Sequence, residues 1–328
     1  MSIWYEITPV DTLFFRGAEA MEAGQLSSDA LFPPPVSVLE GALRTALLRQ
    51  QQIPFAAYNA GNCSGEIFEQ IGRSGEKAPF SIIMIFFRKD GVDYVPCPAN
   101  LFVEEKLDTS SLRITEKNSS TVKIHRAVPK PTASEKLKFR TSARNYALPL
   151  VVADEEIVPL AGHWLKRDLL KKLPDTLTGE DILASTDLYD MEPRTGIALD
   201  PNRKVIESKL YSTGHIRLRY GVSIIIAIDR YIGLADTGML ALGGEKRMSG
   251  YTTITASELS SPPAAAYMTL APVELTDALM PAIISAHKPL VLAGWDLHTG
   301  FHKPTTTWLP AGSVFSYNIN NHCVPLAN

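Results

Sequence analysis

The sequence of 328 residues is poor in cysteine. Cys63, Cys97 and Cys323 lie far apart and form no Cys-x-x-Cys pair, which argues against a zinc knuckle or ribbon. A sparse and odd number of cysteines is also typical of a reducing compartment. The longest apolar runs, at 82–87 and 224–228, are far shorter than the roughly 20 residues of a membrane span. Because the N-terminus has no basic and then apolar leader, we expect a cytoplasmic protein that does not bind membranes.

Signatures of the common catalytic sites are also absent. His298 and His302 are four residues apart, but no Glu follows His298, so the pair does not match the zinc-binding His-Glu-x-x-His sequence. There is no Gly-x-Ser-x-Gly elbow of a serine hydrolase and no Gly-x-Gly-x-x-Gly loop of a dinucleotide-binding unit. We therefore expect no catalytic residue, no metal site and no cofactor.

Net charge is small, because 32 basic residues stand against 35 acidic ones and the formal charge is -3. The charge is nevertheless segregated. Residues 113–144 hold nine Lys or Arg and two Glu, a local charge of +7, which leaves -10 for the rest of the chain. Such a segment can neutralise phosphates and release their counterions, while aromatic rings and imidazoles among the charges can stack on bases. The candidate RNA-binding residues here are Lys123, His125, Arg126, Lys130, Lys138 and Arg140. A solvated surface loop is the alternative interpretation.

A glycine-rich loop at 243–250 is the second candidate. Gly243 and Gly244 permit a close approach of the backbone and can present amide groups to an anion. Lys246 and Arg247 could add charge-assisted hydrogen bonds to phosphate, and a tight turn before a strand at 251–255 is the alternative. A third candidate, Arg194, lies on a predicted hairpin whose turn is at 200–202.

The pattern of apolar residues predicts an α+β protein. The expected elements, in order, are a strand at 3–10, a helix beginning near Ser37, a hairpin of 80–87 and 92–95, a helix at 163–173, strands within 194–228, a strand at 251–255 and a helix at 276–287. This order is typical of two ferredoxin-like split βαβ domains. We expect the first domain at 1–155, with a basic insertion at about 104–145, and the second at 156–328, with the glycine-rich loop.

Several segments, spread from end to end and in the right order, resemble one family. They are residues 4–16, 32–35 leading into 39–44, 194–197 followed by Leu210 and Tyr211, 243–245, and 303–304 with 310–314. Together these segments resemble the third-subunit family of the Cmr effector complex, the type III-B CRISPR system, within the RAMP superfamily.

That resemblance implies two ferredoxin-like domains and a non-catalytic role. Members of the family hold the 5′ handle of CRISPR RNA (crRNA), and they bind the large polymerase/cyclase-like Cmr subunit and the backbone RAMP subunits. Contact with target RNA would be indirect. On this interpretation the glycine-rich loop lies against the handle, and Arg16 and Arg44 are additional RNA-binding candidates, although Arg44 can also pair with Glu40 across one helical turn.

Two other classes of function remain open on the sequence. One is a metal-free RAMP endoribonuclease that processes precursor crRNA, for which His125, His163 or His215 could serve as the general base. A metal-assisted variant would use Asp29 in the N-terminal loop. The other class is a protein adaptor whose basic segment contacts an acidic partner.

Overall fold

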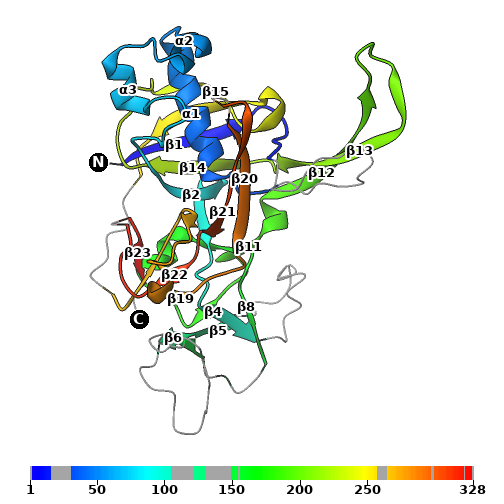
Figure 1. The fold of residues 1–328 in the computed structure, drawn as a ribbon. Coiled ribbons are helices and arrows are strands. Elements are labelled where there is room, and N and C mark those ends of the chain that lie inside the picture. Colours follow the sequence, from blue (N-terminus) through cyan, green and yellow to red (C-terminus); the bar gives the residue numbers. More distant parts are fainter. Residues whose placement is uncertain are drawn as a thin grey trace. The chain divides into compact units, whose positions relative to one another are not determined.

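Strands predominate in this protein, and helices are few (Figure 1). The computed structural model describes residues 2–15, 31–104, 121–129, 149–151, 153, 156–256, 264–296, 299–320 and 322–326. The chain forms two compact units: unit one holds 1–85, 189–256 and 291–306, and unit two holds 86–188, 257–290 and 307–328. The units interleave along the sequence, so they do not coincide with a division of the chain near residue 155.

Unit one is built on an antiparallel sheet with the strand order β2-β14-β1-β16-β15. β1 (Ile3–Pro9) lies at its centre, between β14 (Val222–Ile228) and β16 (Met248–Ile254). β15 (Thr237–Ala241) pairs with β16, and the first half of β2 (Ile82–Lys89) lies beside β14. Every residue of β14 is buried, as expected for an apolar run that is covered on both faces.

Three helices follow β1 in unit one: α1 (Val36–Gln50), α2 (Phe55–Asn59) and α3 (Gly65–Ile71). The apolar face predicted for α1 is confirmed, because Leu39, Leu43 and Leu47 are among its buried residues. The helix begins one residue before Ser37, directly after a proline, and no side chain caps it. None of the described helices is long and apolar enough to cross a membrane.

A long hairpin projects from the sheet of unit one (Figure 1). It consists of β12 (Tyr189–Leu199) and β13 (Val205–Leu218), which pair with each other along nearly their whole length. At its turn the backbone N–H of Lys204 donates to Asp200 Oδ1 over 2.8 Å, as predicted for an Asp-initiated turn. Unit one also holds most of a ribbon made of β20 (Leu290–Asp296) and β21 (Phe301–Leu309).

Unit two contains several small sheets. The second half of β2 pairs with β3 (Val92–Pro96), which confirms the predicted hairpin of 80–87 and 92–95. Its turn is formed by Asp90 and Gly91, with positive φ values of 49° and 82°. β9 (His163–Lys166) pairs with β3, and β11 (Ile182–Ala184) pairs with the other edge of β9. A second sheet has the order β10 (Thr176–Leu177), β5 (Val122–Arg126), β4 (Leu101–Glu104) and β8 (Ile157–Pro159).

Ala282, Leu309 and Phe315 of unit two form a cluster of almost fully buried residues, against which Val273, Leu275 and Ile283 pack. One sheet here has the order β19 (Ile283–Ser285), β22 (Val314–Phe315), β17 (Ala266–Met268) and β23 (Val324–Leu326). The short pairs are β18 (Val273–Glu274) with the end of β21, and β6 (Val128–Pro129) with β7 (Pro149–Leu150).

Two predicted helices are wrong. Residues 163–173 form strand β9 and a 3-10 turn, η2 (Arg167–Lys171), because residues of β9 pair with β3 on one side and β11 on the other. Residues 276–287 hold only another 3-10 turn, η5 (Met280–Ala282), before strand β19. In both segments, long-range strand pairing outweighs a helical apolar pattern that spans only a few turns.

Candidate functional site

The glycine-rich loop packs against residues 10–15, which we call the N-terminal segment. Gly243 has φ +84° and ψ -165°, and a Cβ added there would lie 2.4 Å from the carbonyl oxygen of Phe14. The backbone N–H of Gly244 donates to the same oxygen over 2.8 Å. The close approach predicted for this loop is therefore made to Phe14, and the amide of Gly244 is engaged by a protein carbonyl.

The N-terminal segment is fixed from its other side by β13. Leu13 is fully buried, and it exchanges two backbone hydrogen bonds of 2.8 Å with Ile216. Phe14 stacks on His215 with their ring centroids 5.0 Å apart, and His215 Nδ1 lies 3.3 Å from Thr12 Oγ1. Burial lowers the pKa of His215. The segment is thus held between the hairpin and the glycine-rich loop.

Three arginines converge on Asp11, which lies just beyond β1. Arg194 Nη2 is 3.5 Å from Asp11 Oδ2. Arg217 Nη2 is 3.2 Å from Asp11 Oδ1, and Arg247 Nη1 is 2.9 Å from Oδ2. The arginines come from β12, β13 and the glycine-rich loop, so one carboxylate links three separate segments. We call Asp11, Arg194, Arg217 and Arg247 the arginine cluster.

Two further carboxylates balance the charge of the arginine cluster. Glu192 accepts hydrogen bonds from Arg217 Nε over 2.6 Å and from Arg194 Nε over 3.0 Å. Glu245 accepts one from Arg247 Nη2 over 2.6 Å. These side chains are between 20% and 54% exposed, so the pairs contribute little to stability. Their main effect is to hold three guanidinium planes in fixed directions.

The same contacts keep the network ionised. The backbone N–H of Thr12, followed by the guanidiniums of Arg194 and Arg217, lowers the pKa of the Asp11 carboxyl. Hydrogen bonds from Arg217 and Arg194 lower the pKa of Glu192, which in turn raises the pKa of Arg217. A guanidinium has five N–H donors and the carboxylates engage only some of them, so the cluster can donate to a further anion such as a phosphate.

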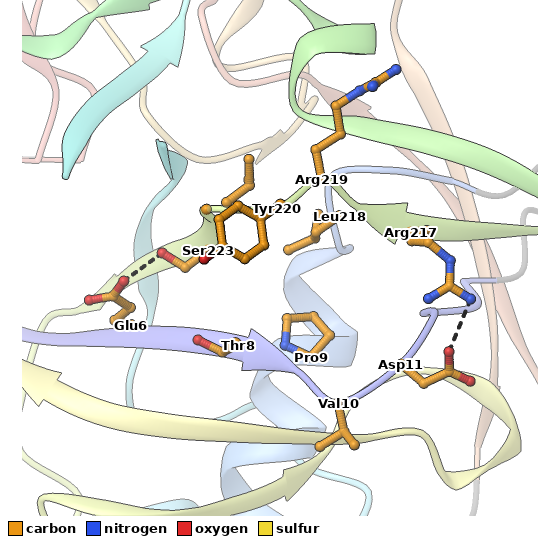
Figure 2. Close-up of a pocket in the computed structure, with 12 residues that line it drawn as sticks. Glu6, Thr8, Pro9, Val10, Asp11, Arg217, Leu218, Arg219, Tyr220 and Ser223 are labelled. Carbon is orange, nitrogen blue, oxygen red and sulfur yellow. Dashed lines mark hydrogen bonds and ion pairs between the residues drawn. The ribbon is translucent and has the colours of Figure 1, made fainter. Parts of the chain in front are cut away.

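An open hollow of about 450 Å³ lies beside the arginine cluster (Figure 2). Its walls are the end of β1 and the turn between β13 and β14, and it shares Asp11 and Arg217 with the cluster. On one wall the hydroxyl of Ser223 donates to Glu6 Oε1 over 2.6 Å. Tyr220, at the turn, is fully exposed.

Of the candidates named from the sequence, the structure brings four together in unit one: Arg194, Gly243, Gly244 and Arg247. The backbone of Lys246 lies in the 3-10 turn of the same loop, η4 (Gly244–Lys246), while its side chain is outside the described part. Arg44 lies elsewhere, on α1, where Nη2 donates to the carbonyl oxygen of Glu76 over 2.9 Å. Arg16 and Asp29 lie outside the described residues.

The candidates in the basic segment belong to unit two, and two of those described have structural partners. His125 is buried, with Nε2 3.2 Å from Glu104 Oε1. Arg126 donates to the carbonyl oxygens of Leu173 over 2.7 Å and Pro174 over 3.4 Å, and burial lowers its pKa. Lys123 is exposed on β5. Lys130, Lys138 and Arg140 lie outside the described residues.

Several residues of the site were not predicted from the sequence. Asp11, Glu192, Arg217 and Glu245 were not named as candidates. One available signal was the alternation of apolar and basic residues at 216–219, which places Arg217 and Arg219 on the same face of a strand. Within the described ranges, no group of His, Cys, Asp or Glu is suited to hold a metal ion.

Comparison with known proteins places the chain in a family. The family model described as "CRISPR-associated protein (Cas_Cmr3)" matches residues 5–270. Among curated proteins, no sequence matches the chain. A similar fold occurs in a cryo-EM structure of the type III-B Cmr-beta bound to cognate target RNA and AMPPnP (TM-score 0.55, 15% identity, covering 95% of this chain and 85% of that one). A second structure, of type III-B Cmr-beta bound to cognate target RNA, gives a TM-score of 0.54 at 14% identity, with 95% and 86% covered. Because the family model spans most of the sequence, the chain belongs to the CRISPR-associated Cas_Cmr3 family.

Proposed function

We propose that this chain is a non-catalytic subunit of a type III-B CRISPR (Cmr) ribonucleoprotein that binds the 5′ handle of crRNA. The observation that carries the proposal is the arginine cluster. Three guanidiniums from distant parts of the sequence meet at one exposed carboxylate, beside the glycine-rich loop. Family membership supports the choice of crRNA as the anion that this surface receives.

Arginine suits this task because its planar guanidinium can donate two parallel hydrogen bonds to a phosphate. The carboxylates of Asp11, Glu192 and Glu245 hold the guanidiniums in place before RNA arrives, so less side-chain entropy is lost on binding. Since the isolated network is charge-balanced, its attraction for RNA acts at short range. Long-range attraction would come from the basic segment at 113–144.

The same proposal covers the partners and the finer fold. We propose that the chain joins the large polymerase/cyclase-like subunit to the backbone RAMP subunits, and that target RNA is reached indirectly. We also propose that the two units descend from ferredoxin-like domains. In support, unit one places β1 at the centre of an antiparallel sheet and follows it with helix α1, as in a split βαβ unit.

Replacing Arg194, Arg217 and Arg247 together with glutamine is expected to weaken the binding of single-stranded handle RNA. Three lost phosphate contacts reduce the slope of log K against log salt by about 2, which corresponds to roughly 40-fold weaker binding near 0.15 M salt if affinities are equal at 1 M. Filter binding across a salt series, with the purified chain and with the assembled complex, measures both values.

Two control variants separate the possible causes. A sixfold variant that also carries Asp11→Asn, Glu192→Gln and Glu245→Gln removes the uncompensated acids, and it should show the same loss. Arg230→Gln changes an exposed arginine of unit one outside the cluster and should bind normally. An unchanged salt slope in the threefold variant would contradict the proposed RNA site and favour a protein adaptor.

The non-catalytic role is tested with labelled repeat RNA incubated without metal, which should remain intact. Its support is the placement of the candidate bases: His125 and His215 are buried, and His163 Nδ1 lies 3.2 Å from the carbonyl oxygen of Ala161. A defined cut that disappears in a His125→Ala, His163→Ala or His215→Ala variant would support the endoribonuclease alternative instead.

A further inference from the structure

We infer that the hollow beside the arginine cluster holds one unstacked base of single-stranded RNA, with the ring of Tyr220 as its stacking platform. The inference rests on the proposed function, because it assigns a place to one nucleotide of the strand whose phosphates the arginine cluster receives. It adds a base-binding element that does not depend on charge. The hollow of about 450 Å³ is within the range of about 300–1,000 Å³ of small-molecule sites.

Tyr220 is presented to solvent. It occupies the tight turn between β13 and β14, where the backbone N–H of Val222 donates to the carbonyl oxygen of Arg219 over 3.1 Å and Gly221 has φ +74°. The turn leads directly into β14, whose residues are all buried. Tyr220 itself is nevertheless 100% exposed, which leaves a large ring face open to stacking.

Polar and apolar residues line the hollow near Tyr220 (Figure 2). Glu6 and Thr8 of β1 and Ser223 of β14 line the hollow, where the Glu6 carboxylate can accept from the edge of a base and the hydroxyls can donate or accept. Pro9 and Val10 add apolar lining. A ring face for stacking, with polar groups at the base edge, is how proteins hold splayed bases of single-stranded RNA.

The hollow shares residues with the arginine cluster. Arg217 lines the hollow and also belongs to the arginine cluster, through its contact of 3.2 Å with Asp11. Arg219, two residues further along the chain, also lines the hollow and pairs with Asp190 over 2.7 Å. A nucleotide whose base enters the hollow would therefore have guanidiniums within reach of its phosphates. This combination selects a nucleotide over an uncharged aromatic ligand.

The experiment uses oligoadenylate RNA with the fluorescent base 2-aminopurine at one position at a time. With the full-length protein, we expect one position to show a fluorescence change that disappears in Tyr220→Ala. That variant should bind RNA roughly 5- to 150-fold more weakly, as measured for the loss of one base–aromatic stack. The salt slope should stay unchanged, because stacking releases no counterions.

Matched variants and a second ligand complete the test. Tyr220→Phe keeps the ring and should bind within about twofold of the unmodified protein, and Tyr231→Ala removes another exposed tyrosine of unit one without effect. Equal urea unfolding midpoints establish that Tyr220→Ala is folded.

If Tyr220→Ala keeps both the affinity and the fluorescence change, the inference is overturned and the proposed function stands. If the unmodified protein shows no salt-dependent RNA binding, the inference and the proposed function are both contradicted. If adenosine monophosphate binds as tightly as the RNA, the hollow is a free-nucleotide site and the inference is also overturned.

Discussion

Replacing Gly243 with alanine is expected to destabilise the protein by about 2 to 6 kcal/mol, combining backbone strain with overpacking. Its φ of +84° with ψ of -165° lies in a region that essentially only glycine occupies. The added Cβ would also lie 2.4 Å from the carbonyl oxygen of Phe14 and 2.9 Å from Phe15 Cε1, so the backbone of one segment must move. Urea unfolding of the purified variant measures the loss, and we expect RNA binding to weaken with it.

Two other glycines provide matched controls. Gly91 has a similar φ of +82°, but a Cβ there meets no atom within 4 Å, so Gly91→Ala should cost only the backbone strain of about 1 to 2 kcal/mol. Gly41 lies in α1 with open space around it, and Gly41→Ala should stabilise the helix by about 0.5 to 1 kcal/mol. If Gly243→Ala costs no more than Gly91→Ala, the tight contact with Phe14 does not exist.

Leu13→Ala is expected to reduce the free energy of unfolding by about 2 to 5 kcal/mol, the usual range for a buried leucine that leaves a cavity. Leu13 is 0% exposed and its backbone is bonded to Ile216 on β13. The same residue anchors the segment that carries Asp11, so we also expect faster amide exchange at Leu13 and Ile216 and weaker RNA binding. Urea unfolding and hydrogen exchange check these results.

Val10→Ala is the control from the same segment. Val10 is 71% exposed, so its truncation should change stability by no more than about 0.5 kcal/mol. Equal stabilities of the Leu13→Ala and Val10→Ala variants would show that the N-terminal segment is not packed against β13. Normal RNA binding by a destabilised Leu13→Ala variant would separate the fold of this segment from the proposed site.

Local patterns predicted the elements that depend on neighbours in sequence. The burial of Leu39, Leu43 and Leu47 follows from helical spacing, and the turn at Asp90 and Gly91 follows from the positive φ that Gly tolerates and Asp adopts more readily than most residues. The predicted helices at 163–173 and 276–287 failed because pairing with β3 and β22 decides their conformation. Those partners lie tens of residues away in the sequence, where periodicity carries no information about them.

The candidate site shows the same difference between features that local sequence predicts and features that depend on long-range contacts. Two adjacent glycines indicated a close approach of the backbone, and the structure supplies the neighbour, Phe14. Nothing in the sequence connected Asp11 with Arg217 or Arg247, because they are 206 and 236 residues apart and each is an ordinary charged residue. Conversely, Arg126 looked like a phosphate contact by its place in a basic segment, yet the described structure gives it two carbonyl partners at Leu173 and Pro174.

The distance along the chain between Asp11 and Arg247 has a consequence during synthesis. Residues 189–219 and 243–250 leave the ribosome long after residue 11, so the three guanidiniums cannot gather around that carboxylate until about three quarters of the polypeptide has emerged. A nascent or truncated chain therefore lacks the complete arginine cluster. Under the proposed function, a guide RNA can bind there only after unit one has folded, so RNA binding would indicate that the subunit is intact.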